Sequence, residues 1–436
     1  MKLIFLSFFV TLDTLCVPKS MGFFRVRKFM KLFKSLLVAP ATLGLLAPMA
    51  ATANEVTIND FNAAEEIAVT NSRVDGLEAR FNNLEAGSFS DTTTLDGKAI
   101  FTLMGTDHAK VQAGADDGID SVQAAYTYQM NLNTSFTGDD NLYVRIKTGN
   151  HAGNSVDKEF GTYLSSGNNY SDALKVDKIW YTFPVGESNT FWVGPKIENY
   201  YMHGTTPSIY KPVTKQFTLG GNGEAFGAST NSGAGWAYKA DNGFAISSNF
   251  VSQQNATATK GLLTNQAATS WASQVGYTTD RWSVSALVNQ KYNGWSDTYY
   301  HSLGHSPASG GNNFSSVGLR SWWRPAETGT ATPSVSVGFD TTNYDSAPAT
   351  SDNSTAYFIG LTWQDMFQAD DRMGVAFGQP TTNEDETVSP SAYEIYYSFK
   401  ANDSVTITPA VFGGSDRNGT SGEDIFGAVL ETTFKF

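Results

Sequence analysis

The stretch Gln123–Phe136 reads QAAYTYQMNLNTSF, and its side chains alternate between two characters. Successive residues of a β-strand point to opposite faces, so this run forms one apolar face and one polar face. The apolar face holds Val122, Ala124, Tyr126, Tyr128, Met130, Leu132 and Phe136. The stretch is long enough to cross a bilayer as a tilted strand. The pattern therefore predicts a strand with lipid on one side and water on the other.

The same alternation of apolar and polar residues, interrupted by breaks, repeats from residue 95 to the end of the chain. Seven short polar breaks, such as residues 279–281, alternate with eight long ones, such as residues 293–313, and divide the region into sixteen strands. An even number of strands with alternating turn and loop lengths is typical of bacterial single-chain barrels. We therefore predict an all-β fold, a 16-stranded antiparallel transmembrane β-barrel over residues 95–436, with both ends in the periplasm. A soluble β-sandwich is the alternative, but it would not require such regular alternation of turn and loop lengths.

The last residues alternate up to the chain end, with Phe434 and Phe436 on the expected lipid face. Such a terminal strand is the kind that the outer-membrane assembly machinery recognises. We therefore predict that these two residues form the assembly signal and that the barrel closes where the chain ends.

The N-terminal residues 1–53 have the character of a secretion signal. A basic segment at residues 30–34 precedes an apolar segment at residues 35–50, and Ala51-Thr52-Ala53 is a small-x-small cleavage site. The basic residues farther upstream are unusual for a signal, so the true start is predicted at Met30. After residue 53 no run of 18 apolar residues remains, which excludes helical membrane spans. The only cysteine, Cys16, lies in the part to be removed, and the chain's net charge of −13 argues against a nucleic-acid partner.

Residues 54–87 are the one stretch with helical periodicity. A seam of apolar residues at heptad spacing predicts a short periplasmic coiled coil, formed by Ile67, Val74, Leu77, Phe81 and Leu84. An isolated helix of this length is marginal in water, so a partner is expected. We predict self-association, with a homotrimer as the assembly. A single amphipathic helix packed on its own domain is the alternative.

The junction between this helix and the first strand resembles that of a known family. Residues 73–85 (RVDGLEARFNNLE) and 89–101 (FSDTTTLDGKAIF) are similar to the major outer-membrane porins of cyanobacteria, in the OprB-like carbohydrate-selective porin family. Residues 175–186 resemble that family's fourth strand. The resemblance implies passive diffusion of sugars, inorganic ions or iron species. These porins usually carry an S-layer-homology domain before the coiled coil, but residues 53–67 leave no room for it, so we do not predict cell-wall anchoring.

Selectivity in a barrel of this width depends on what narrows the channel. The third long loop, residues 199–222, is the best candidate because it combines aromatic rings with positive charges. The predicted constriction residues are Tyr200, Tyr201, His203, Tyr210, Lys211 and Lys215. An exposed loop with ordinary surface lysines is the alternative.

Charged residues in the strands are expected to face the lumen, since Arg or Lys toward lipid at mid-depth costs roughly 2–4 kcal/mol. The predicted pore-wall residues are Arg145, Lys147, Lys196, Arg320 and Glu394. This set is mostly basic although the protein is acidic, so a modest preference for anions is expected. Mixed charge that only keeps the lumen wet is the alternative.

No enzyme, cofactor or metal site is predicted. All five histidines fall in expected loops, and none lies on a strand beside a serine or aspartate that could complete a catalytic triad. The expected partners are outer-membrane lipid and surface glycolipid, further copies of the chain, small hydrophilic solutes and the assembly machinery. A structural or adhesive barrel without an open pore is the remaining alternative function.

Overall fold

The computed structural model describes residues 70–74, 92–107, 121–151, 163–221, 223–253, 261–295, 313–345 and 352–436. The predicted signal, residues 1–53, lies outside these ranges. So do four coiled-coil positions, Ile67, Leu77, Phe81 and Leu84. Residues 70–74 are helical, and Val74 is exposed there. No helix in the described ranges is long and apolar enough to span a membrane.

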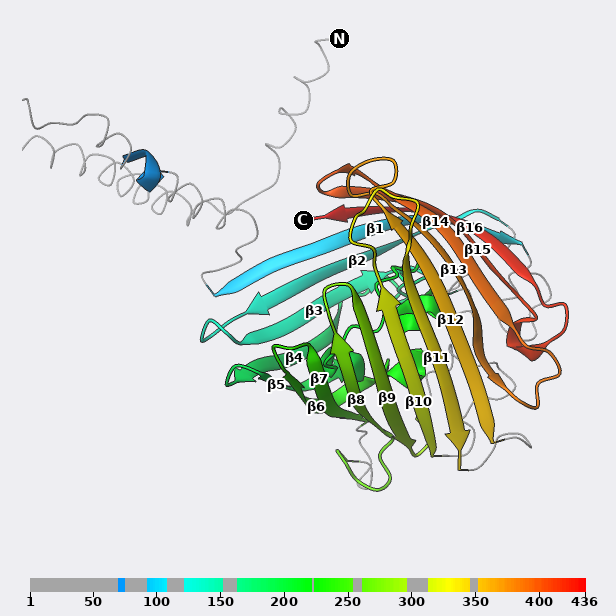
Figure 1. Ribbon diagram of the computed structural model, residues 1–436, viewed down its shortest axis with the longest axis horizontal. Helices are drawn as coiled ribbons and strands as arrows, with labels where there is room; N and C mark the ends of the chain where they lie inside the picture. The colour runs from blue at the N-terminus through cyan, green and yellow to red at the C-terminus, as the bar shows by residue number, and fades with distance from the viewer. Residues whose placement is uncertain are drawn as a thin grey trace, which may run out of the picture. The chain divides into compact units, whose positions relative to one another are not determined.

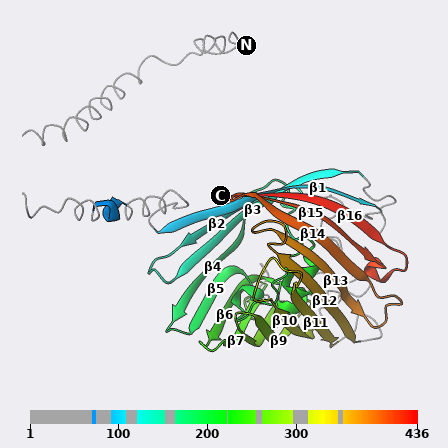
Figure 2. The ribbon, with the colours of Figure 1, turned by 45° about the horizontal axis from the view of Figure 1, so that its top comes forward.

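Sixteen antiparallel strands form a closed barrel in which each strand pairs with its sequence neighbours and β1 pairs with β16 (Figures 1 and 2). The predicted fold is confirmed. The strands are β1 (Thr93–Asp107), β2 (Gln123–Thr134), β3 (Asn141–Gly149), β4 (Lys175–Val185), β5 (Asn189–Glu198), β6 (Thr230–Lys239), β7 (Phe244–Ser252), β8 (Thr269–Thr278), β9 (Trp282–Tyr292), β10 (Phe314–Trp323), β11 (Ser334–Tyr344), β12 (Asn353–Gln364), β13 (Arg372–Asn383), β14 (Ser391–Asn402), β15 (Val405–Ser415) and β16 (Ile425–Lys435).

The alternation of side chains becomes an alternation of burial. On β1, Phe101 and Leu103 are about half exposed on the outer face, whereas Ile100 and Met104 on the inner face are buried. The inner face is not water-filled everywhere, because parts of it are covered by chain folded into the barrel. The outer face has the apolar character that a lipid environment requires.

The barrel closes at the chain's last residue. Gly97 and Phe436 exchange two backbone hydrogen bonds, of 2.9 and 3.2 Å. A Cβ at Gly97 would lie 2.6 Å from the Phe436 ring, so a glycine is needed where the two strands meet. Phe436 also stacks on Tyr128, and Phe434 packs against Phe101. The final residues are therefore part of the seam, and their role in assembly stays a prediction.

Carboxylates fix two of the short turns. Asp140 accepts hydrogen bonds from the Tyr181 hydroxyl, the backbone N–H groups of Phe136 and Thr137, and two hydroxyls. The Tyr181 bond, followed by those from the turn, holds the pKa of Asp140 well below its usual range. Asp371 organises the turn before β13 in the same way, through the backbone N–H groups of residues 366–368.

Candidate pore constriction

The connection between β5 and β6, residues 199–229 and here called loop 3, runs across the inside of the barrel. It contains two short 3-10 helices, η2 (Asn199–Met202) and η3 (Lys215–Gly220), and one turn of α-helix, α3 (Gly223–Phe226). Its outgoing limb bonds to successive strands. Thr205 N–H donates to Gln274 on β8, Thr206 accepts from Trp322 on β10, and Ile209 N–H donates to Ser336 on β11. The loop therefore follows the inner wall instead of extending from the barrel end.

A single carboxylate on β14 anchors the far end of loop 3. Glu394 is fully buried and accepts four hydrogen bonds. Its Oε1 receives the Tyr210 hydroxyl at 2.9 Å and Val213 N–H at 3.0 Å, and its Oε2 receives Thr214 N–H at 2.7 Å and the Thr214 hydroxyl at 2.6 Å. Every partner is a donor, which suits an ionised carboxylate that only accepts.

The returning limb lies directly on β10 and β11. Arg320 pairs with Asp340 at 2.9 Å, and its Nε donates to the Leu219 carbonyl at 2.8 Å. Both charged side chains are 1% exposed. A Cβ at Gly338 would lie 1.8 Å from the Gly220 carbonyl oxygen, so only glycine lets the loop backbone approach this close.

A second segment, residues 163–174 before β4 and here called loop 2, also enters the barrel. Leu164 forms a β-bridge with Thr214, and two backbone bonds flank it: Ser165 N–H to the Val213 carbonyl at 2.7 Å and Lys215 N–H to the Tyr163 carbonyl at 2.5 Å. Ser166 joins this segment to the wall through Glu431 on β16. The two loops therefore form one hydrogen-bonded unit in the lumen.

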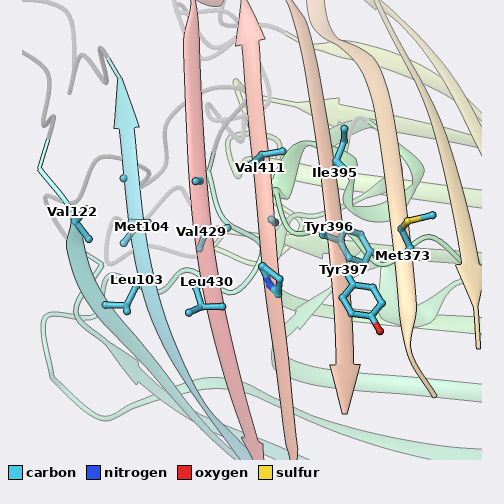
Figure 3. A pocket seen from close by; sticks show the side chains of 14 residues that line it. Leu103, Met104, Val122, Met373, Ile395, Tyr396, Tyr397, Val411, Val429 and Leu430 are labelled. Carbon is cyan, nitrogen blue, oxygen red and sulfur yellow. The ribbon is translucent and has the colours of Figure 1, made fainter. Parts of the chain in front are cut away.

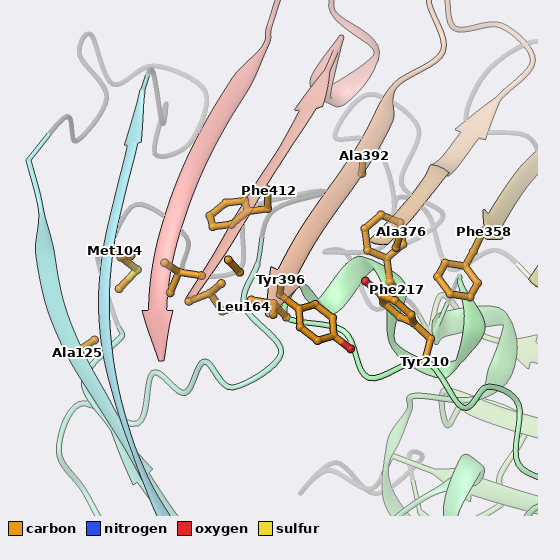
Figure 4. Packing of buried hydrophobic residues seen from close by; sticks show 13 residues of the cluster. Met104, Ala125, Leu164, Tyr210, Phe217, Phe358, Ala376, Ala392, Tyr396 and Phe412 are labelled. Carbon is orange, nitrogen blue, oxygen red and sulfur yellow. The ribbon is translucent and has the colours of Figure 1, made fainter. Parts of the chain in front are cut away.

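Apolar packing fixes that unit to one side of the wall. Leu164 and Phe217, at 0% and 1% exposure, lie among inward residues of β1, β2 and β12–β16 (Figure 4). The cluster comprises Met104, Ala125, Leu164, Tyr210, Val213, Phe217, Phe358, Ala376, Ala392, Tyr396, Ala410, Phe412 and Val429. This side of the lumen is filled by side chains.

An open space of about 310 Å³ remains between the loops and the inner faces of β1–β3. Four of its lining residues are basic: Lys98, Arg145, Lys147 and Lys215. The other residues around it are Ile100, Thr127, Gln129, Ser165, Ser166, Glu198, Tyr200, Thr218, Leu219 and Ala228. We call this space the basic opening.

Ion pairs hold some of these charges in place. Arg145 Nε donates to Asp177 at 2.5 Å, and its Nη1 donates to the Tyr201 hydroxyl at 3.1 Å. Glu198 pairs with Lys178 at 3.1 Å. The strands at the opening are thereby tied to the start of loop 3.

Aromatic rings line up beside Arg145. Tyr143 and Trp180 have ring centroids 4.3 Å apart, Trp180 and Tyr201 are 4.7 Å apart, and Tyr201 and Tyr200 are 4.3 Å apart. The stack runs from the wall into loop 3 and ends at the basic opening, where Tyr200 is a lining residue.

Only some of the six residues predicted for the constriction lie at the basic opening. Tyr200 and Lys215 line the basic opening, and Tyr201 bonds to Arg145. Tyr210 is a buried anchor on Glu394, and Lys211 is exposed beside Arg372 of β13. His203 is buried, with Nε2 donating to the Phe226 carbonyl at 2.9 Å and Nδ1 accepting from Asn249 at 3.1 Å.

Three of the predicted wall residues need correction, whereas Arg145 and Lys147 do line the opening. Arg320 and Glu394 face inward as expected, but loop 3 covers both of them, so they fix the loop instead of facing water. Lys196 was expected on the polar face, and this was wrong. A bulge between Gly194 and Ile197 reverses the alternation and pairs Lys196 with Ile179, while its ammonium donates to the Val176 carbonyl at 2.8 Å.

The sequence reasoning missed Lys98 and the whole of loop 2. Lys98 had a usable signal, because it begins an alternating inward row of β1 that continues with Ile100 and Thr102. Loop 2 had none, since its contacts join residues some 50 to 265 positions apart. In the described ranges no group of three or more His, Cys, Asp or Glu side chains is placed to hold a metal ion; His301 and His305 lie outside those ranges.

The outer wall carries an apolar groove of about 660 Å³ across β1 and β13–β16 (Figure 3). Leu103, Ile395 and Leu430 form its exposed rim, each 40–50% exposed, and the small residues Gly105 and Ala428 lie at its base.

A closed 16-stranded barrel with an apolar outer face and inward-folded loops defines an outer-membrane porin, a channel-forming protein. A family model described as "Carbohydrate-selective porin, OprB family" matches residues 67–436, and the chain belongs to this family.

Two curated relatives match the sequence. An uncharacterized protein of Nostoc sp. is 26% identical over 450 residues, which is 92% of this chain and 75% of that protein. An uncharacterized protein of Synechocystis sp. is 34% identical over 161 residues, covering 36% of this chain and 27% of that protein.

Solved porins share the fold at low sequence identity. Pseudomonas putida OprB superimposes with a TM-score of 0.56 and 11% identity, over 79% of this chain and 94% of that one. A porin from Comamonas acidovorans, titled anion-selective, superimposes with a TM-score of 0.51 and 8% identity, over 79% of this chain and 99% of that one.

Proposed function

We propose that this porin lets small hydrophilic solutes diffuse passively through the basic opening, with a preference for anions. The observation that carries the proposal is the group of four basic side chains around the open space between loops 2 and 3 and β1–β3. Like charges lining a narrow, low-dielectric passage raise the local concentration of counter-ions. Sugars, inorganic ions and iron species are the proposed solutes. The stack from Tyr143 to Tyr200 supports sugars, since aromatic faces accommodate the apolar side of a sugar ring.

The remaining parts of the proposal concern assembly. Sixteen strands place the start of β1 and the end of β16 on one side of the barrel, and we assign this side to the periplasm. We assign self-association as a homotrimer to the outer groove of β1 and β13–β16, whose exposed apolar rim favours a protein partner or lipid. Crosslinking in native membranes, with and without a Gly105→Trp change that fills the groove, tests this assignment. An unchanged trimer band in the variant would move the interface elsewhere.

Planar-bilayer recording of the purified protein tests the channel itself. We expect stepwise conductance and a reversal potential of the sign that anion movement produces in a KCl gradient. A structural or adhesive barrel would insert without conductance. A reversal potential that follows cations would show that the basic opening does not control permeation.

A further inference from the structure

The charges around the basic opening do not cancel. Arg145 is matched by Asp177, and Glu198 is matched by Lys178. Glu431 attracts Lys98 electrostatically from the neighbouring strand, while its carboxylate accepts a hydrogen bond from Ser166. Glu198 also attracts Lys215 electrostatically, so one carboxylate serves two lysines, and Lys147 has no acidic partner of its own among these groups. Positive charge therefore exceeds negative charge among the side chains named here.

Lys147 is the centre of this surplus. It is partly buried; the charges of Arg145, Lys215 and Lys98 repel its charge, and Asp177 attracts it. Among the described residues, no side chain or carbonyl accepts a hydrogen bond from its ammonium. An ammonium has three hydrogens to donate, and those of Lys147 are therefore available to a solute in the opening. The basic opening thus offers hydrogen-bond donors to a solute.

Two hydroxyls of the lining have already donated their hydrogens to backbone carbonyls. The hydroxyl of Thr127 donates to the Ser166 carbonyl at 2.8 Å, and that of Thr218 donates to the Lys215 carbonyl at 2.7 Å. At this point of the lining the Lys147 ammonium therefore supplies the hydrogen-bond donors. A solute that only accepts hydrogen bonds and carries negative charge fits the lining.

The strand register brings two of the cations to one point. Lys98 on β1 pairs with Gln129 on β2, which pairs with Lys147 on β3. Strands lie about 4.8 Å apart, so the two lysine Cα atoms are about 10 Å apart with a side-chain amide between them. Flexible lysine side chains can converge from this spacing on one small anion, and lysine binds phosphate groups as a point charge.

We infer that the basic opening is a binding site for a phosphate-type oxyanion, held mainly by Lys147 and Lys98. The space of 310 Å³ is large enough for a phosphate group with a small organic group attached. Free inorganic phosphate and a phosphorylated small solute share this chemistry. The inference deepens the proposed function, because it gives the channel a saturable site for one class of anion.

Isothermal titration of the full-length protein in detergent with inorganic phosphate tests binding independently of conduction. We expect saturable binding at one site per chain. Lys147→Gln should weaken it by about tenfold or more, as expected for loss of a hydrogen bond to a charged group. Lys147→Arg should keep most of the affinity. Lys211→Gln, a matched change on loop 3 away from the opening, should leave binding unchanged. Absence of saturable binding, or equal affinity in Lys147→Gln, overturns the inference.

Bilayer recordings separate the possible ligands. Phosphate added to KCl should reduce the chloride current along a saturating curve, and glucose should not. If glucose 6-phosphate blocks at lower concentration than phosphate, the site takes a phosphorylated solute; the reverse order indicates free phosphate. Equal block by glucose overturns the inference. A protein that binds phosphate but conducts no ions would refute the proposed function alone.

Discussion

The attachment of loop 3 to Glu394 leads to the sharpest prediction about the channel's width. In Glu394→Gln one carboxylate oxygen becomes an amide nitrogen, which is itself a donor. The backbone N–H of Val213 or Thr214 then faces the amide nitrogen and loses its acceptor, and the other three bonds become bonds to a neutral group. Hydrogen bonds to charged groups contribute roughly 1.5–3 kcal/mol each, so the attachment should weaken by about 3–6 kcal/mol.

Even the lower figure raises the population of detached loop 3 by about 150-fold. Because the loop bounds the basic opening, single-channel traces of Glu394→Gln should show frequent steps to a larger conductance. Tyr210→Phe removes only one of the four bonds, so it should give rarer steps of the same size. Heat-modified electrophoretic mobility checks that both barrels are folded. Traces of Glu394→Gln with wild-type amplitude and noise would refute the reasoning and show that packing around Leu164 and Phe217 holds the loop without the carboxylate.

Three further changes probe other parts of the structure. Lys215→Glu should shift the reversal potential strongly toward cations. Lys211 is exposed beside Arg372, so Lys211→Glu should shift the potential little; equal shifts would show that the basic opening is not the place where ion selectivity is set. Burial lowers the pKa of His203 to about 4, below the roughly 6.5 of an unfolded histidine. Its contribution to stability should therefore be intact above pH 6.5 and decline as the pH falls toward 4, and His203→Gln should remove this decline in thermal unfolding followed by circular dichroism. Deletion of Phe436 removes the last pairing with Gly97 and should reduce the amount of folded barrel in outer membranes; normal amounts would contradict its assembly role.

Side-chain alternation was sufficient for the barrel because lipid and water impose a period of two on every strand. The alternation within Gln123–Phe136 was enough to predict a strand there, and the strand in the structure ends at Thr134. The same rule failed for Lys196, because one extra residue in a bulge reverses inside and outside. Pro195, which lies in that bulge, was a usable signal that alternation alone does not read.

The position of the loops could be predicted only in part. Aromatic and basic residues pointed to loop 3, but its path depends on distant partners such as Glu394 and Arg320, which alternation could place inward but not beneath the loop. Loop 2 is held by a bridge between Leu164 and Thr214, and no local sequence feature encodes such a contact. The pairing of two loops depends on the folded barrel that brings them together.

On the proposed route, solutes pass Lys147 at the basic opening. A single cysteine at this position, Lys147→Cys, made with Cys16 replaced by serine, allows direct modification during current recording. A negatively charged thiol reagent should lower the anion current sharply, because it places a negative charge among Lys98, Arg145 and Lys215. The same reagent on Lys196→Cys, at the outer face, should have no effect. Labelling of Lys147→Cys confirmed by mass spectrometry, with unchanged current and reversal potential, would contradict the account.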